Sequence, residues 1–274
     1  MRDKIKQSAN NPFVRNVIKM ASGTVAAQAI TMALAPFITR LYGPDAYGIM
    51  GTFMAIITII APIAALTYPT AIVLPKHDRD AKGIIRLSIY IAIAIASVVA
   101  ILLLLFHQPI VRIFQIEEVA PYLFLIPIVI LSAGFLQVVE QWLIRTKQFG
   151  ISAKAAVMQA VIIQGGKAGI GFFYPIAPVL VILSALAEAA KASMMLLFAR
   201  KSNYQETAIE EDAEEVSIKQ LANKHKDFPI YRAPQVFLNS ASQSLPILLL
   251  ASFFGPAAAG FYSISRTVLS IPAH

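Results

Sequence analysis

A polar face runs along an apolar stretch of the sequence that covers residues 229–254. Its side chains follow one another at intervals of three, four and four residues, which is the spacing of one helical face. They are Arg232, Gln235, Asn239 and Gln243. A guanidinium can donate two parallel hydrogen bonds to phosphate oxygens, whereas amides both donate and accept. The face therefore suits an anionic headgroup that carries sugar hydroxyls, although hydrogen bonds between helices would use the same groups.

Two more cations lie deep within apolar stretches. Arg266 is placed about half a span beyond the Gly-Pro pair at 255–256, which makes it the strongest single candidate for a central anion contact. Lys167 is a second candidate for contact with the anion, with helix packing alone as the alternative. Gly165 and Gly169 form a GxxxG pattern around it, which predicts a close helix contact. Gln28 is a weaker candidate for the same substrate.

Acidic side chains within the apolar stretches are candidates for ion coupling. Glu188 and Lys191 are three residues apart, so they share a helical face and are expected to neutralise each other. Alternatively, Glu188 carries a proton or pairs with a coupling ion such as sodium, and Lys191 contacts the substrate. Glu140 is a second ion-coupling candidate, with an interfacial position as its alternative.

These groups must be positioned by helices that cross a membrane. The chain is 57% hydrophobic and 14% charged, whereas soluble domains carry about 25% charged residues. A helix needs ~20 mostly apolar residues to span a bilayer. Such stretches lie at roughly 17–39, 48–68, 84–106, 122–144, 155–174, 178–199 and 229–254, and an eighth begins near 259. The sequence predicts an all-α membrane protein, a polytopic bundle with about eight transmembrane helices.

One turn motif occurs twice and suggests two homologous halves. Residues 43–48 read GPDAYG, and residues 255–260 read GPAAAG, each after an apolar stretch. We therefore predict a six-helix lobe at 1–199, a cytoplasmic linker at 200–228, and the first two helices of a second lobe at 229–274. A complete second lobe would raise the number of helices to twelve, so we expect a C-terminally truncated chain.

Lysine and arginine are unevenly distributed among the connections. They gather in the N-terminal segment and in the connections near 76–86, 145–154 and 200–228, whereas the other connections hold only Arg40 and Arg112. The positive-inside rule places the N-terminus in the cytoplasm. The net charge of +8 follows mostly from this asymmetry, so we do not expect nucleic acid as a partner. The acidic linker is predicted to be solvated, with a regulatory role as the alternative, and Tyr231 is interpreted as an interface anchor.

Several classes of function are disfavoured by what the sequence lacks. It has no cysteine, and its four histidines have no partners at metal-ligand spacing. It has no phosphate-binding loop for ATP. A membrane enzyme such as a glycan polymerase or acyltransferase would need a large outer loop or an intramembrane histidine. We expect neither an enzyme nor a bound cofactor.

Several motifs resemble those of bacterial Wzx-type polysaccharide and O-antigen flippases, which belong to the multidrug/oligosaccharidyl-lipid/polysaccharide exporter superfamily. They are FITRLYGP at 37–44, AIVLP at 71–75, QWLIR at 141–145, KDFP at 226–229 and QSLPILLLASFFGP at 243–256. The resemblance covers nearly the whole chain. Pro69-Thr70 departs from the pattern, where a bulky polar or acidic residue is expected. That family has twelve to fourteen helices, which this chain does not reach.

The resemblance implies a function. Such proteins move undecaprenyl-pyrophosphate-linked oligosaccharides across the bacterial cytoplasmic (inner) membrane by alternating access. Applied to this chain, it suggests that Arg266, Lys167 and Arg232 hold the pyrophosphate. Proton or sodium coupling would use Glu188, membrane lipids would surround the helices, and a polysaccharide polymerase and a chain-length regulator would be partners.

Two alternatives stay open. One is an ion-coupled multidrug exporter of the same superfamily, which would favour acidic cavity residues for cationic drugs. The intramembrane candidates here are mostly basic, which favours an anionic substrate. The other is an inactive fragment, because eight helices would leave a second lobe open.

Overall fold

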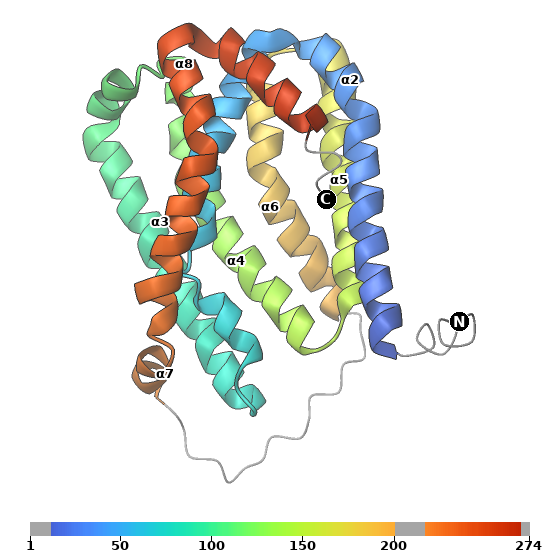
Figure 1. The fold of residues 1–274 in the computed structure, drawn as a ribbon, viewed down its shortest axis with the longest axis vertical. Coiled ribbons are helices and arrows are strands. Elements are labelled where there is room, and N and C mark those ends of the chain that lie inside the picture. The colour runs from blue at the N-terminus through green and yellow to red at the C-terminus, as the bar shows by residue number, and fades with distance from the viewer. Residues whose placement is uncertain (1–11, 201–216, 270–274) are drawn as a thin grey trace.

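The computed structural model describes residues 12–200 and 217–269, and its regular structure is helical throughout these ranges. Long helices run side by side (Figure 1), and short ones connect them at their ends. The long ones are α2 (Pro12–Ile60), α3 (Asp78–Phe114), α4 (Ile126–Arg145), α5 (Phe149–Phe173), α6 (Ala177–Arg200) and α8 (Ala233–Leu269). The short ones are η1 (Ala61–Ile63), η2 (Tyr68–Val73), η3 (Ala120–Leu125), α7 (Ile218–Lys224) and η4 (Phe228–Arg232).

Two of the long helices are each folded back at a glycine. A continuous helix of 49 residues, the length of α2, would be about 74 Å long, more than twice the thickness of a bilayer core. It breaks instead at Gly43, with φ 73° and ψ 173°, and α8 breaks at Gly255, with φ 80° and ψ 176°. Glycine is the residue that adopts such positive φ without strain. Two arms in α2, two in α8 and one span in each of the other long helices account for the eight predicted stretches.

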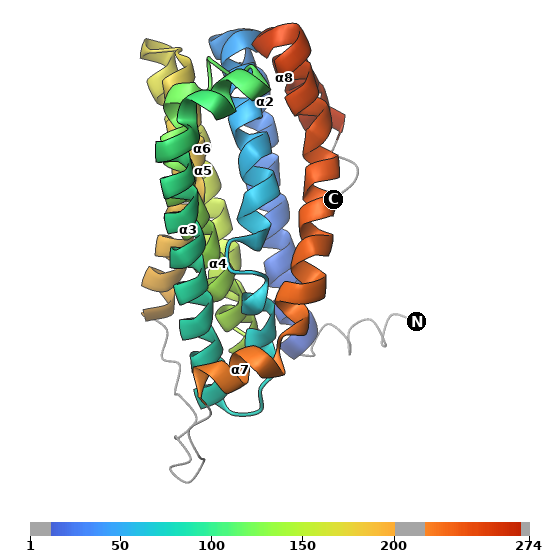
Figure 2. The same ribbon diagram turned by 90° about the vertical axis from the view of Figure 1, so that its left-hand side faces the viewer.

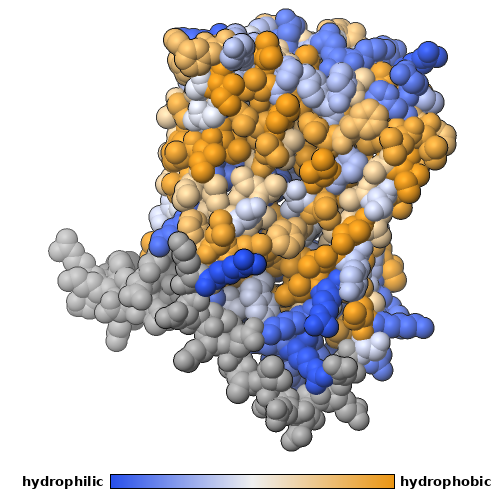
Figure 3. All heavy atoms as spheres, turned by 180° about the vertical axis from the view of Figure 1, so that it is seen from behind, coloured by the Kyte–Doolittle hydropathy of each residue, from blue (hydrophilic) through white to orange (hydrophobic). Residues whose placement is uncertain are grey.

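The surface of the bundle is that of a membrane protein. Within residues 12–200 and 217–269, six helices are long and apolar enough to span a membrane. Large apolar side chains point outward along them, such as Leu104, which is 71% exposed, and Phe253, which is 74% exposed. Apolar residues cover the middle of the face in Figure 3, and polar residues gather at its two ends. The chain is therefore an all-α, multi-pass membrane protein, as the composition predicted.

The two ends of the bundle differ in the elements that form them. At one end, here named the turn end, lie the breaks at Gly43 and Gly255 and the connection 115–119. At the other, here named the basic end, lie the start of α3, the end of α4 and α7.

The second arm of α2 packs between the rest of the bundle and α8. Ala55 of α2 joins a buried cluster with Ile247, Ala251 and Ala259 of α8. Small side chains at these positions let the two helices approach closely, which is how helices associate in membranes. On its other side, the region of α2 around Ile38 and Tyr42 packs against α5 and α6.

The chain is irregular after the second arm of α2 ends, between α2 and η2. Pro62 lies in η1, and its missing N–H contributes to the end of the α-helix there. The carbonyl of Ala61 accepts a hydrogen bond from Gln137 Nε2 at 2.7 Å. Leu66 and Thr67 then follow with φ of 48° and 58°, a left-handed conformation that is rare for such residues.

One prediction of packing is wrong. A β-carbon on Gly165 or Gly169 would meet no neighbouring atom within 4 Å, so the GxxxG pattern makes no helix contact among the described residues. Close contacts of α5 lie instead at Gly171, against the ring of Tyr42, and at Ala153, against Gly23. Of the predicted linker, residues 201–216 lie outside the described ranges. Most of residues 217–228 are exposed, but α7 docks across the basic end (Figure 2), and its Leu221 is only 1% exposed.

Candidate functional site

A hollow at the basic end of α8 gathers three residues of the predicted polar face. Its volume is about 500 Å³. The lining residues are Asp227, Phe228, Tyr231, Arg232, Gln235, Val236 and Asn239. Arg232, Gln235 and Asn239 are exposed to it, as expected from their helical spacing. The two aromatic residues were not predicted as site residues.

The aromatic residues enter the hollow through a widened turn. Residues Phe228–Arg232 form a π-helix, in which the Ala233 N–H donates to the Phe228 carbonyl. Pro229 and Pro234 lie at the two ends of this turn and lack the N–H groups that an α-helix needs. A π turn inserts an extra residue into the helical repeat, and such turns are frequent at functional sites. A sequence signal was present in Pro229 and Pro234, which flank Tyr231.

The hollow offers three kinds of interaction next to each other. The guanidinium of Arg232 lies 5.8 Å from the ring centroid of Phe228, a cation–π geometry that holds it at the wall. Tyr231 is 71% exposed and offers a flat apolar ring with a hydroxyl at its tip. The amides of Gln235 and Asn239 can donate and accept. This arrangement can bind a ring that has many hydroxyls together with an anionic group.

The remaining residue of the polar face pairs with Arg266. Nη1 of Arg266 donates to the backbone carbonyl of Gln243 at 3.2 Å, which joins the two arms of α8. Both residues are exposed, and neither lines the hollow.

Lys167 lies away from the hollow and is buried. Its side chain is 9% exposed, and its amine lies 3.9 Å from the sulfur of Met50. The Tyr42 hydroxyl donates to the Lys167 backbone carbonyl at 2.8 Å. In this conformation α2 therefore covers the amine.

The intramembrane acidic residues lie together at the α4–α6 contact. Lys191 Nζ of α6 forms an ion pair with Glu140 of α4 at 2.7 Å. The hydrogen-bonded partner of Lys191 is therefore Glu140 and not Glu188, because the packing of α6 on α4 supplies that carboxylate. Glu188 is half-buried one turn before Lys191. Gln28 is exposed on the first arm of α2, apart from these groups.

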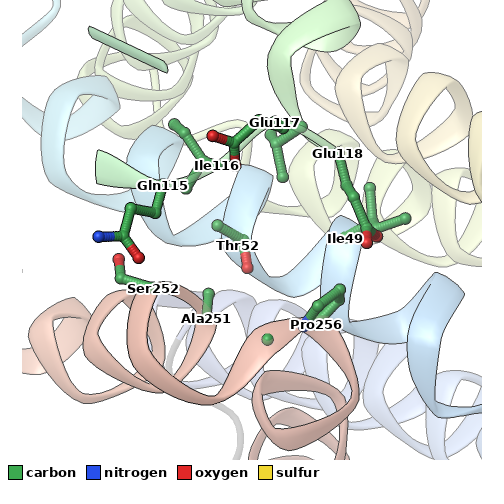
Figure 4. A pocket seen from close by; sticks show the side chains of 11 residues that line it. Ile49, Thr52, Gln115, Ile116, Glu117, Glu118, Ala251, Ser252 and Pro256 are labelled. Carbon is green, nitrogen blue, oxygen red and sulfur yellow. The ribbon is translucent and has the colours of Figure 1, made fainter. Parts of the chain in front are cut away.

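A second, smaller pocket of about 250 Å³ lies at the turn end (Figure 4). It is formed by Ile49 and Thr52 of α2, by the connection 115–119 and by α8 around Gly255. In Figure 4, Glu118 extends toward Ile49 and Pro256. The Ser252 hydroxyl donates to the Phe114 carbonyl at 2.8 Å and ties α8 to the end of α3. None of the predicted site residues lines this pocket.

Comparison with known proteins places the chain in a family. The model of the polysaccharide biosynthesis protein family matches residues 37–274. This chain belongs to the polysaccharide biosynthesis protein family. A search of curated proteins and a search of solved structures find no significant match. The membership indicates a role in polysaccharide synthesis or export, which agrees with a multi-pass membrane fold and with a hollow suited to hydroxyl-rich ligands.

Proposed function

We propose that this member of the polysaccharide biosynthesis protein family translocates a lipid-linked oligosaccharide, the undecaprenyl-pyrophosphate-linked unit of an O-antigen, capsule or exopolysaccharide. The observation that carries the proposal is the hollow, in which an arginine, two exposed amides and an aromatic ring meet at one end of a membrane-spanning helix. A saccharide with a diphosphate group needs both hydroxyl partners and a cation.

The hollow also lies where a lipid-linked substrate would enter. The basic end carries the excess of lysine and arginine, which favours a cytoplasmic location in the bacterial inner membrane. The saccharide would bind in the hollow, and the lipid tail would stay in the bilayer beside α8, whose exposed face is apolar. This mode of binding needs no covalent step, so we propose a transporter and not an enzyme.

Alternating access would then move the ligand across. We propose that residues 1–199 act as one lobe, residues 200–228 as a linker and residues from 229 as the start of a second lobe. Rocking of α8 against α2 is the motion expected of repeat-built transporters. We propose that Arg266 serves as a later contact of the pyrophosphate, and that Lys167 does so once α2 moves off its amine. The group of Glu140, Glu188 and Lys191 is our candidate for proton or sodium coupling.

The proposal is tested by transport in reconstituted vesicles. Proteoliposomes would contain the purified chain and an undecaprenyl-diphosphate-linked oligosaccharide, and translocation would be followed by the exposure of its sugar to an external lectin. We expect Arg232→Ala and Asn239→Ala to slow translocation at least tenfold. Arg112→Ala is the matched control, because Arg112 is also exposed but lies at the turn end of α3. No translocation above protein-free vesicles would contradict the proposal, and export of a cationic dye instead would favour the drug exporter.

A further inference from the structure

Unusual backbone from two distant segments meets at the basic end. Leu66 and Thr67 are consecutive left-handed residues, and residues 228–232 form the π turn. The Thr67 hydroxyl joins the two, because it donates to the Phe228 carbonyl at 3.0 Å. Thr67 is only 5% exposed, so this bond is shielded from water. Conformations of this kind persist only where surrounding contacts hold them, and they gather at functional sites.

The Phe228 carbonyl is the point at which the π turn is held. It accepts both the Ala233 N–H of the turn and the Thr67 hydroxyl, which uses its two lone pairs. Tyr231 and Arg232 lie within the same turn and line the hollow. A shift of this carbonyl would therefore move both side chains.

A second set of contacts holds α7, the helix that precedes the π turn. Leu221 of α7 is 1% exposed in a cluster with Ile72, Ala81 and Ile84. A β-carbon on Gly83 would meet a terminal methyl group of Leu221, so this side chain lies directly over the glycine. The Tyr68 hydroxyl donates to the Ala222 carbonyl at 3.2 Å. The side chains of Thr67 and Tyr68 therefore form hydrogen bonds to the backbone on either side of residues 223–227.

We propose that Thr67 is a positioning residue for the hollow, and that α7, seated on Gly83 through Leu221, is a brace that keeps the Thr67–Phe228 hydrogen bond formed. The brace, α7, lies in the segment between α6 and α8, whereas the hollow is formed by η4 and α8. Release of α7 would free the π turn and change the shape of the hollow. What the hollow binds rests on the proposed function, but the coupling between α7 and the π turn does not.

The coupling is tested by distance measurement without any substrate. The chain has no cysteine, so spin labels on Gln235→Cys and Arg86→Cys are the only ones in the full chain. Both positions are exposed. In the otherwise unchanged chain we expect one main distance between α8 and α3. Thr67→Val should raise the population of a second distance about fivefold, the change that corresponds to one neutral hydrogen bond.

Three further variants separate positioning from general damage. Thr67→Ser keeps the hydroxyl and should retain the main distance. Leu221→Ser should give the same second distance as Thr67→Val, because it removes the brace. Thr58→Val is the control, since the exposed Thr58 hydroxyl bonds only to the Met54 carbonyl of its own helix. An unchanged distance in Thr67→Val, or an equal change in Thr58→Val, would overturn the proposal.

Transport supplies a second readout that a purely structural role would not move in the same way. In the vesicle assay, Thr67→Val should raise the substrate concentration for half-maximal translocation about fivefold and leave the maximal rate nearly unchanged. If the vesicles transport no oligosaccharide at all, the proposed function fails and the distances still decide the positioning role. Normal transport with unchanged distances would retain the proposed function and reject the role of Thr67.

Discussion

Gly48 and Gly260 occupy equivalent places in a reciprocal contact between α2 and α8. A β-carbon on Gly48 would overlap with the Pro256 carbonyl, and one on Gly260 would overlap with the Pro44 carbonyl. Each glycine lies five residues after the glycine that breaks its own helix. In a two-fold interface, the same pair of positions meets twice with the roles exchanged. The repeated motif in the sequence therefore corresponds to two similar turns that pack against each other.

This contact predicts a cost for any added side chain. Gly48→Ala and Gly260→Ala should each lower stability by about 1–3 kcal/mol, because backbone lies where the methyl group would go. The thermal unfolding midpoint in detergent measures the effect. Gly169→Ala is the matched control, since its β-carbon would meet open space, and alanine favours helix. Equal midpoints for Gly48→Ala and Gly169→Ala would contradict the close contact.

Arg145 is predicted to be a structural residue and not a simple topology signal. Its guanidinium forms an ion pair with Asp78 at 2.8 Å and donates to the carbonyls of Ile72 and Pro75. Its side chain is only 11% exposed. Arg145→Ala should destabilise the protein by roughly 3 kcal/mol, because it removes the buried guanidinium that joins the Asp78 carboxylate to two backbone carbonyls.

Arg145→Lys should restore little of this stability, since an ammonium cannot reproduce the planar fork. Thermal unfolding is again the measurement, with the exposed Arg86→Ala on α3 as control. Full rescue by lysine would mean that only the charge matters.

The ion pair between α4 and α6 predicts strong coupling between its two members. Lys191→Met alone should destabilise the protein, because the Glu140 carboxylate would lose its partner within the membrane span. Lys191→Met together with Glu140→Leu should be less destabilised than the sum of the two single variants. A double-mutant cycle on unfolding free energies measures this difference. Strict additivity would show that the pair contributes nothing.

The docking of α7 is predicted to weaken at acidic pH. Burial lowers the pKa of His225 from its ordinary value of 6.5, the neighbouring Lys224 lowers it further, and Asp80 partly opposes both. Nε2 of His225 is buried without a hydrogen-bond partner. Docking therefore favours the neutral ring. The stability of the docked state is fully present above pH 6.5, and it declines as the pH falls through that value toward the lowered pKa.

Tryptophan fluorescence can follow this change, because Trp142 is the only tryptophan of the chain and packs against the same cluster as Leu221. The emission should shift between pH 7.5 and 5.5. In His225→Phe, which cannot be protonated, the shift should vanish. A shift of the same size in that variant would assign the transition to another group.

The sequence alone was enough to predict the spans and their breaks. A bilayer requires long apolar helices, so their positions can be read from local composition. The Gly-Pro motifs predicted the turns at Gly43 and Gly255, because a positive φ is a property of glycine itself. The helical period also placed Arg232, Gln235 and Asn239 on one face, and three of the four residues of that face line the hollow. The prediction missed Phe228, although it lies four residues before Arg232 and so shares its helical face, and it missed Tyr231, which lines the hollow from the π turn.

Only the tertiary structure decided which faces meet. The spacing in α6 predicted Glu188 as the partner of Lys191, but the approach of α4 supplied Glu140. The glycines around Lys167 predicted a contact that α5 makes instead at Gly171, where the ring of Tyr42 packs. The linker composition did not indicate that Leu221 packs over Gly83, or that Thr67 reaches a carbonyl more than 150 residues away. Local sequence sets helical periods and turn conformations, whereas partners across the bundle depend on how whole helices pack.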